Sequence, residues 1–167
     1  MSGPRGFEVM SLVVREYREG DASAVRACVV ELQESERTLD ARLRPAETMA
    51  DAYCARIRVR CGDAGGQVFV AEHDGAVVGF VAVLAQEPFT DLDDPPGTFA
   101  LVTDLVVRSR YRGRGIGRQL LRRAEQFVRE AGARELRIGV LADNVGARQL
   151  YLASAFVPHL EIFVKRW

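Results

Sequence analysis

The segment 112–117, Arg-Gly-Arg-Gly-Ile-Gly, constrains the fold of this chain more than any other feature. It lies between an apolar, strand-like run from Thr98 to Val107 and a helical pattern from about Ile116 to Ala131. Three alternating glycines leave backbone N–H groups free of covering side chains at a helix N-terminus, which carries partial positive charge. Each hydrogen bond from such an N–H to a charged oxygen contributes roughly 1.5–3 kcal/mol. The segment therefore predicts a strand-turn-helix unit whose turn cradles a pyrophosphate.

Hydrophobic periodicity predicts the elements around this unit. Helices are expected from Asp21 as N-cap, from about Pro45 to Arg60, and from Asn144 to about Ser154, with Gly132 ending the helix after the glycines. Asp74-Gly75 predicts a type I′ hairpin turn between two strands. Apolar runs predict strands at 12–17, 67–73, 76–85 and 136–141, and a last strand within 157–165. This order indicates an α/β chain in which helices flank a mixed sheet.

Length and charge limit the class of protein. The 167 residues fit one domain, with residues 1–10 as a flexible tail and residues 11–167 as a single domain. Lys plus Arg equals Asp plus Glu at 23 each, so no global charge draws the chain to nucleic acid or to an anionic membrane. The longest apolar run, Val77 to Ala85, is far shorter than the ~20 residues that span a bilayer.

Cysteine usage and the N-terminal composition favour the cytoplasm. The first ten residues lack the apolar stretch of an export signal. Cys28, Cys54 and Cys61 show no CxxC spacing and no nearby histidine. We therefore expect reduced cysteines that serve packing, and no bound metal.

With the glycine segment placed, the chain resembles the GNAT superfamily of N-acetyltransferases, which bind acetyl-CoA and acetylate amines. Residues 112–117, following Asp104-Leu105-Val106-Val107, match the family's Gln/Arg-x-x-Gly-x-Gly/Ala motif. Residues 144–151 are similar to its Asn-x-x-Ala-x-x-Leu-Tyr helix, and 155–165 are similar to its closing Gly-Phe and strand. The resemblance covers residues 68–167, whereas over 12–60 only the strand-helix-helix order matches. It implies a GNAT-like acyl-CoA N-acyltransferase fold with a central, mostly antiparallel sheet.

The resemblance also implies a role for each matching residue. The backbone of residues 105–107 would pair with the pantetheine arm as an added strand, and the glycine segment would hold the pyrophosphate. Asn144 would bond the pantetheine, and Tyr151 would act as the acid toward the departing thiolate. The implied cofactor-binding residues are Leu105, Val106, Val107, Arg112, Gly113, Arg114, Gly115, Ile116, Gly117, Arg118 and Asn144.

Acetylation of an amine also needs a means of removing a proton. An alkylamine with a pKa of about 10.4 is neutral in roughly one molecule in 2,500 at pH 7, so freeing its lone pair costs about 4.6 kcal/mol. Asp104 is the one ionisable side chain of the strand 98–107 and is the candidate base, directly or through water. A purely structural aspartate is the other interpretation, and Glu72 and Glu87 are weaker candidates. Related acetyltransferases often carry a glutamate where this chain has Thr103.

Together these features predict an N-acetyltransferase that moves the acetyl group of acetyl-CoA to a primary amine by direct attack in a ternary complex. The alternative is a non-catalytic acyl-CoA-binding sensor. The resemblance is also compatible with a homodimer. A cluster of acidic residues would suit a small cationic acceptor, or is a solvated face. The cluster comprises Glu31, Glu34, Glu36, Asp40, Asp91, Asp93 and Asp94.

Overall fold

The computed structural model describes residues 11–167, so the predicted tail at 1–10 lies outside the described residues. Short 3-10 turns precede the first three helices, and the element order follows the predicted order up to the last helix. The elements are β1 (Leu12–Glu16), α1 (Ala22–Leu39), α2 (Ala50–Asp63), β2 (Gln67–His73), β3 (Ala76–Pro88), β4 (Thr98–Val107), α3 (Ile116–Glu130), β5 (Leu136–Ile138) and α4 (Val145–Leu152).

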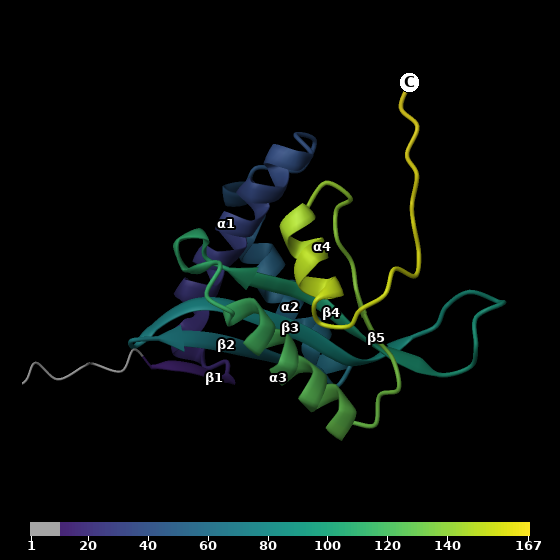
Figure 1. Ribbon diagram of the computed structural model, residues 1–167, viewed down its shortest axis with the longest axis horizontal. Helices are drawn as coiled ribbons and strands as arrows, with labels where there is room; N and C mark the ends of the chain where they lie inside the picture. The colour runs from purple at the N-terminus through teal and green to yellow at the C-terminus, as the bar shows by residue number, and fades with distance from the viewer. Residues whose placement is uncertain (1–10) are drawn as a thin grey trace, which may run out of the picture.

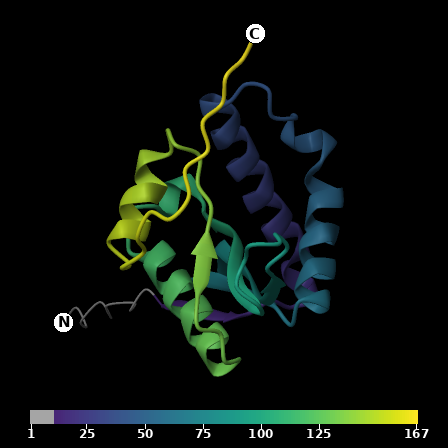
Figure 2. The same ribbon diagram turned by 90° about the vertical axis from the view of Figure 1, so that its right-hand side faces the viewer.

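The five strands form one sheet in the order β1-β2-β3-β4-β5. The first four strands are antiparallel, and β5 joins β4 in parallel. Helices α1 and α2 cover one face of the sheet, and α3 covers the other with α4 beside it (Figure 1 and Figure 2). This arrangement confirms the predicted α/β fold with a mostly antiparallel sheet flanked by helices.

Strand alternation builds a core on each face of the sheet. In β2, Val68 and Val70 pack with α1 and α2, whereas Phe69 and Ala71 pack with α3. Neighbouring residues point to opposite faces of a strand, so one apolar run supplies both cores. The predicted hairpin turn is confirmed because Asp74 and Gly75 both have the positive φ angles, 50° and 78°, that a type I′ turn requires.

One predicted capping bond and one predicted helix start differ from the structure, although Asp21 does occupy the N-cap position of α1. Asp21 was expected to cap α1, but its carboxylate instead accepts two hydrogen bonds from Arg15, at 2.8 and 2.9 Å, and one from the Arg18 N–H. A buried salt bridge thus takes the oxygens that a cap would need. The helix expected from Pro45 begins as a 3-10 turn, Ala46–Thr48, and α2 starts only at Ala50.

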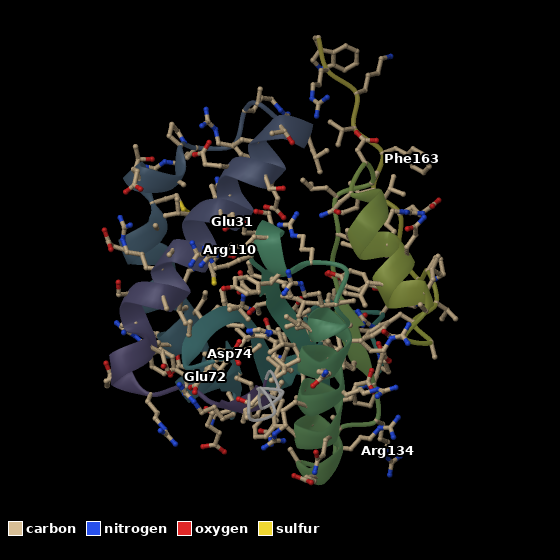
Figure 3. All side chains as sticks on the ribbon, turned by 60° about the vertical axis from the view of Figure 1, so that its left-hand side comes forward. Glu31, Glu72, Asp74, Arg110, Arg134 and Phe163 are labelled. Atoms are coloured by element: carbon tan, nitrogen blue, oxygen red, sulfur yellow. The ribbon has the colours of Figure 1, made fainter. Side chains whose placement is uncertain are left out.

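The predicted last strand within 157–165 is wrong. No strand forms there, and the segment runs away from the sheet towards the C-terminus, with Phe163 far from β-structure (Figure 1 and Figure 3). Leu160 and Ile162 are 79% and 81% exposed. The apolar alternation is typical of a strand, but a strand also needs a neighbouring backbone to pair with. In the structure β5 ends at Ile138 rather than Leu141, and no described segment covers its outer edge.

Candidate active site

The edge of β4 is free just where the predicted pantetheine site lies. β5 pairs with β4 only at Ala100, Leu101 and Val102, although β3 stays paired with β4 as far as Val107. The two parallel strands therefore separate beyond residue 102. An unpaired strand edge presents N–H and C=O groups that an extended ligand can bond.

A β-bulge at Thr103 sets the direction of the next side chain. Ala82 of β3 opposes Asp104, and Val83 opposes Val102, so Thr103 has no partner of its own. Such an extra residue bends the strand and redirects its side chains. Asp104 consequently lies on the α2 side of the sheet, where the Tyr53 hydroxyl reaches it.

The glycine segment forms an open turn at the start of α3. Gly113 and Gly115 have φ angles of 73° and 77°, in the left-handed region that glycine tolerates best. A Cβ built at either position would meet no atom within 4 Å, so the space in front of the backbone is free. The Arg112 N–H already donates to the Ser109 carbonyl at 3.1 Å. Among the described residues, the N–H groups of residues 113–118 have no protein acceptor.

Gly117 has a packing role that the sequence did not reveal. A Cβ at this position would lie 3.0 Å from Cδ2 of Leu150 in α4. The absence of a side chain therefore lets α4 approach the start of α3. Because Asn144 and Tyr151 belong to the α4 unit, Gly117 also helps to place both of them beside the glycine turn.

Asn144 caps α4, and Tyr151 lies half-buried two turns later. The Asn144 Oδ1 accepts a hydrogen bond from the Ala147 N–H at 3.2 Å, which is the N-cap role expected from its side chain. Burial and the nearby charge of Glu36 raise the pKa of Tyr151 to about 12. Tyr151 thus keeps its proton at neutral pH and can donate it in a hydrogen bond.

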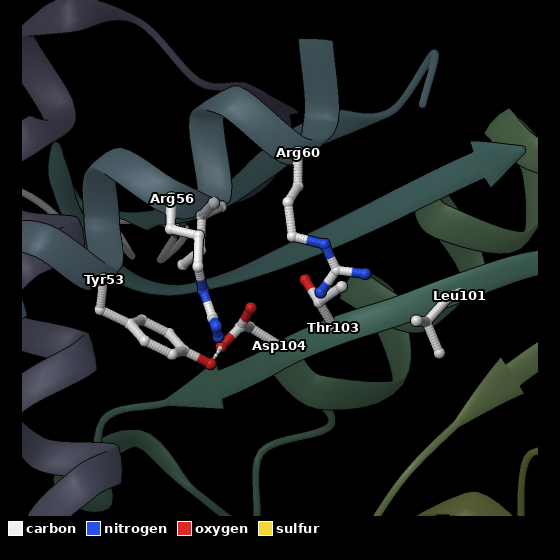
Figure 4. A pocket seen from close by; sticks show the side chains of 7 residues that line it. Tyr53, Arg56, Arg60, Leu101, Thr103 and Asp104 are labelled. Atoms are coloured by element: carbon white, nitrogen blue, oxygen red, sulfur yellow. Dashed lines mark hydrogen bonds between the residues drawn. The ribbon is translucent and has the colours of Figure 1, made fainter. Parts of the chain in front are cut away.

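Asp104 of β4 is a buried acid, with 4% of its surface exposed. Its Oδ1 accepts a hydrogen bond from the Tyr53 hydroxyl at 2.8 Å (Figure 4). Its Oδ2 is buried and has no partner among the described residues. Burial raises the pKa of this carboxyl above the usual range, against the opposing effects of the Tyr53 hydrogen bond and the charges of Arg56 and Arg60.

Two neighbours of Asp104 were not assigned to the site from the sequence. Tyr53 packs against the core on the α2 side of the sheet, and its hydroxyl also bonds Asp104, 51 residues away. Glu36 was one member of the acidic cluster, and burial and the charge of Asp104 raise its pKa. The charge of Asp104 contributes to the raised pKa of Glu36, and the charge of Glu36 contributes to the raised pKa of Tyr151.

Both weaker candidate bases, Glu72 and Glu87, and three acids of the cluster are paired with arginines. Asp104 is therefore the candidate base that keeps an unpartnered oxygen. The arginine pairs also indicate that most of the acidic cluster on α1 is a solvated face whose charge is neutralised. The pairs are Glu31 with Arg108, Glu34 with Arg37, Asp40 with Arg42, Glu72 with Arg15, and Glu87 with Arg60.

The cysteines of the core are packing residues. Cys28 and Cys61 are buried, and burial raises the pKa of each thiol to about 11, so neither forms a reactive thiolate at neutral pH. Within residues 11–167, no three His, Cys, Asp or Glu side chains gather as metal ligands would. In the same residues, no helix has the length and hydrophobicity to cross a membrane.

Comparison with known proteins identifies the family. The family model described as "Acetyltransferase (GNAT) family" matches residues 25–156, which is more than three quarters of the chain. The chain belongs to the GNAT acetyltransferase family. The family match includes every candidate residue named above.

Relatives in the GNAT family carry acetyltransferase names. N-acetyltransferase 8F1 of Rattus norvegicus is 36% identical over 56% of this chain, which spans only 41% of the relative. The aminoglycoside N(6')-acetyltransferase type 1 of Stenotrophomonas maltophilia is 32% identical over 64% of this chain and 70% of its own. Among solved structures, the aminoglycoside N-acetyltransferase AAC(6')-Iy in complex with CoA has a TM-score of 0.71 at 17% identity, with 99% of each chain covered. At that identity the structural similarity shows the fold.

Proposed function

We propose that this GNAT chain transfers the acetyl group of acetyl-CoA to a primary amine, which attacks directly in a ternary complex. The family match and the acetyltransferase names of its relatives support acetyl transfer. The observation that carries the proposal is the buried Asp104, whose free Oδ2 lies beside the unpaired edge of β4. The proposed base for the amine and the proposed binding edge for the cofactor are therefore parts of the same strand, β4.

The cofactor is proposed to lie along the free edge of β4 and the start of α3. N–H groups of residues 113–118 lack protein acceptors and stand at the positive end of a 15-residue helix, as a diphosphate requires. The backbone of Leu105 to Val107 is proposed to bond the pantetheine arm, and Asn144 retains its amide NH₂ for the same purpose. The Val107 carbonyl accepts a 2.9 Å hydrogen bond from Arg112 Nε, which orients this arginine towards the same edge.

Asp104 is proposed to bind the acceptor as its ammonium and then to take its proton. A carboxylate with a raised pKa is a stronger base than an ordinary aspartate, so part of the roughly 4.6 kcal/mol cost of freeing the amine is offset. The nitrogen lone pair then attacks the thioester carbonyl carbon. The C–N bond forms, the C–S bond breaks, and the electron pair of the broken bond goes to sulfur. The nitrogen gives up its second proton to solvent, which leaves the neutral amide and supplies the proton that the thiolate finally takes.

Tyr151 is proposed to stabilise the negative charge that develops on sulfur. Its pKa of about 12 makes complete proton transfer to a thiolate of conjugate pKa near 8.5 unfavourable by roughly 5 kcal/mol. A strong hydrogen bond from the Tyr151 hydroxyl in the transition state avoids that cost. The role of Tyr151 is therefore hydrogen-bond donation, with full protonation of the thiolate completed afterwards.

The test is release of free CoA thiol from acetyl-CoA by the purified chain over a panel of primary amines. An enzyme releases thiol only when a suitable amine is present, whereas an acyl-CoA sensor binds acetyl-CoA by calorimetry and releases none with any amine. Absence of binding heat with both acetyl-CoA and CoA would overturn the cofactor site itself.

The acceptor is proposed to be a small amine, in keeping with the aminoglycoside named for one relative. A cytoplasmic location is also proposed, since the described cysteines are free.

We further propose a homodimer in which the segment 157–165 pairs with a second copy. Its residues Leu160, Ile162 and Val164 alternate and are exposed, and no strand of the described chain pairs with the outer edge of β5.

A further inference from the structure

A pocket between α2 and β4 adjoins the proposed base. Its volume is about 200 Å³, which corresponds to roughly six or seven water molecules and suits a small ligand (Figure 4). The charged side chains of the lining are two arginines from α2 and one aspartate from β4. The lining residues are Tyr53, Arg56, Ile57, Arg60, Leu101, Thr103 and Asp104.

The aspartate of the pocket has one oxygen without a hydrogen-bond partner among the described residues. Asp104 is 4% exposed, and its Oδ2 has no hydrogen-bond partner within residues 11–167 although its Oδ1 is bonded to Tyr53. A buried carboxylate oxygen left without a donor is costly, so it is usually paired in the working state. A primary ammonium supplies three N–H donors and a positive charge, and therefore complements this oxygen.

One of the two arginines of the pocket, Arg56, has no ion pair with a described carboxylate, and its guanidinium lies beside Asp104 and the Tyr53 hydroxyl (Figure 4). Arg56 and Arg60 are four residues apart on α2 and therefore share a helix face. Arg60 is held by Glu87 at 3.1 Å. The guanidinium of Arg56 lies 5.0 Å from the centre of the Tyr53 ring and forms no ion pair with a carboxylate of the described chain. Its planar set of N–H donors fits a carboxylate in two parallel hydrogen bonds.

We propose that the acceptor is a small zwitterionic amine of the amino-acid type. Its ammonium binds Asp104, and its carboxylate binds Arg56. The assignment rests on the proposed acetyl transfer and names the class of its acceptor. It replaces the purely cationic acceptor that the acidic cluster suggested, because arginines pair most of those acids on α1 while Arg56 and Arg60 repel a second positive charge in the pocket.

The test compares amines that differ only by a carboxylate. L-Lysine is paired with cadaverine, and ω-amino acids of increasing length are paired with the matching n-alkylamines. We expect kcat/KM to be at least tenfold higher for the best carboxylated member than for its partner. Arg56→Gln should bring that ratio close to one, mainly through KM, with the Kd for acetyl-CoA unchanged. Arg58→Gln is the matched control, because Arg58 is an exposed arginine of the same helix outside the pocket lining.

Two results would overturn the assignment. One is a wild-type preference for cadaverine or the plain alkylamines, and the other is an equal loss on both members of a pair in Arg56→Gln. Calorimetric titration of L-lysine and cadaverine into the protein saturated with CoA gives the same comparison without turnover. Carboxylate-dependent binding without thiol release would contradict the proposed transfer and leave the pocket assignment standing.

Discussion

At the scale of single residues, the burial of Asp104 lowers the stability of the fold and also favours the proposed role of its carboxylate as a base. Its burial raises the pKa of the carboxyl in the folded chain above that of the unfolded chain, which is near 3.9. Between those two pKa values the folded state binds more protons. Stability therefore falls as pH rises through that interval, so at pH 7 the burial of the Asp104 carboxyl costs the fold stability.

Asp104→Asn should stabilise the protein while removing activity. The amide keeps an acceptor for Tyr53 and removes the buried charge, so Tm should rise at pH 7 and the gain should disappear at acidic pH. The value of kcat/KM should fall by about 10²–10⁴-fold, as for loss of a general base. Thermal unfolding and thiol-release assays measure both effects. Asp51→Asn, at an exposed position beside Arg26, is the control for charge removal. A lower Tm together with full activity would make Asp104 a structural residue.

The wild-type pH profile is a second test of Asp104. The base acts only when ionised, so kcat/KM should fall as pH drops through its raised pKa. The midpoint of this acid limb should lie above the usual aspartate value near 3.9. An acid limb that follows only the unperturbed value would remove Asp104 from the mechanism.

Tyr151→Phe separates turnover from cofactor binding. The ring and its packing near Phe156 remain, and only the donor to the developing thiolate is lost. We expect kcat to fall by about 10²–10³-fold, because one donor to transition-state charge contributes roughly 2.7–4 kcal/mol in such sites. The Kd for acetyl-CoA should stay within about twofold, because the substitution changes no charge. Tyr17→Phe, on the α1 and α2 side of the core, is the control. Equal activity of Tyr151→Phe and Tyr17→Phe would show that the Tyr151 hydroxyl has no part in catalysis.

At the scale of elements, the turn between β4 and α3 combines a fixed backbone with open space. Gly115 is the N-cap position of α3 and has a φ of 77°. Asn and Asp adopt this conformation more readily than other non-glycine residues, and both are good N-caps. They also differ only in charge. The position therefore allows a substitution that tests anion binding without breaking the turn.

Gly115→Asp should weaken acetyl-CoA binding more than Gly115→Asn does. Both add the same bulk in front of the N–H groups of residues 113–118, but only aspartate repels a diphosphate. We expect at least a tenfold further increase in Kd for the aspartate variant, measured by calorimetry, with the Tm of the two variants within a few degrees. Affinity for acetyl-CoA that is the same in both variants and in wild type would place the diphosphate elsewhere. Gly117 is unsuitable for this test, because a side chain there meets Leu150 and disturbs α4.

At the scale of the whole molecule, residues 157–167 are exposed and pair with no described strand. Ile162 is 81% exposed, and Trp167 is fully exposed. Alternating apolar side chains on an extended segment are typical of a strand that is buried on one face. Pairing with a second copy would supply the missing neighbour.

The proposed homodimer is tested by mass in solution. Light scattering on the wild-type protein should give twice the 18.5 kDa of one chain. Ile162→Asp should shift the mass towards one chain, because it places a charge in the middle of the paired segment. Val145→Asp, at an exposed apolar site of α4, should leave the dimer intact. A wild-type mass of one chain at micromolar concentration would contradict the proposal.

The sequence alone determined those features that depend on short stretches of backbone. Glycines at 113 and 115 indicated a turn before a helix, and Asp74-Gly75 indicated a hairpin, because each reflects the dihedral preferences of adjacent residues. Apolar periodicity likewise predicted the strands up to β5 and the helices, with shifts of a few residues at their ends.

Only the tertiary structure decided which distant groups meet. The hydrogen bond of Tyr53 to Asp104, the salt bridge of Arg60 with Glu87 and the contact of Gly117 with Leu150 join residues 27 to 51 positions apart. Such contacts follow from the twist, the bulge at Thr103 and the packing of helices on the sheet, none of which has a local signature. The same dependence explains the missing last strand, since its side-chain pattern is local and its partner is not.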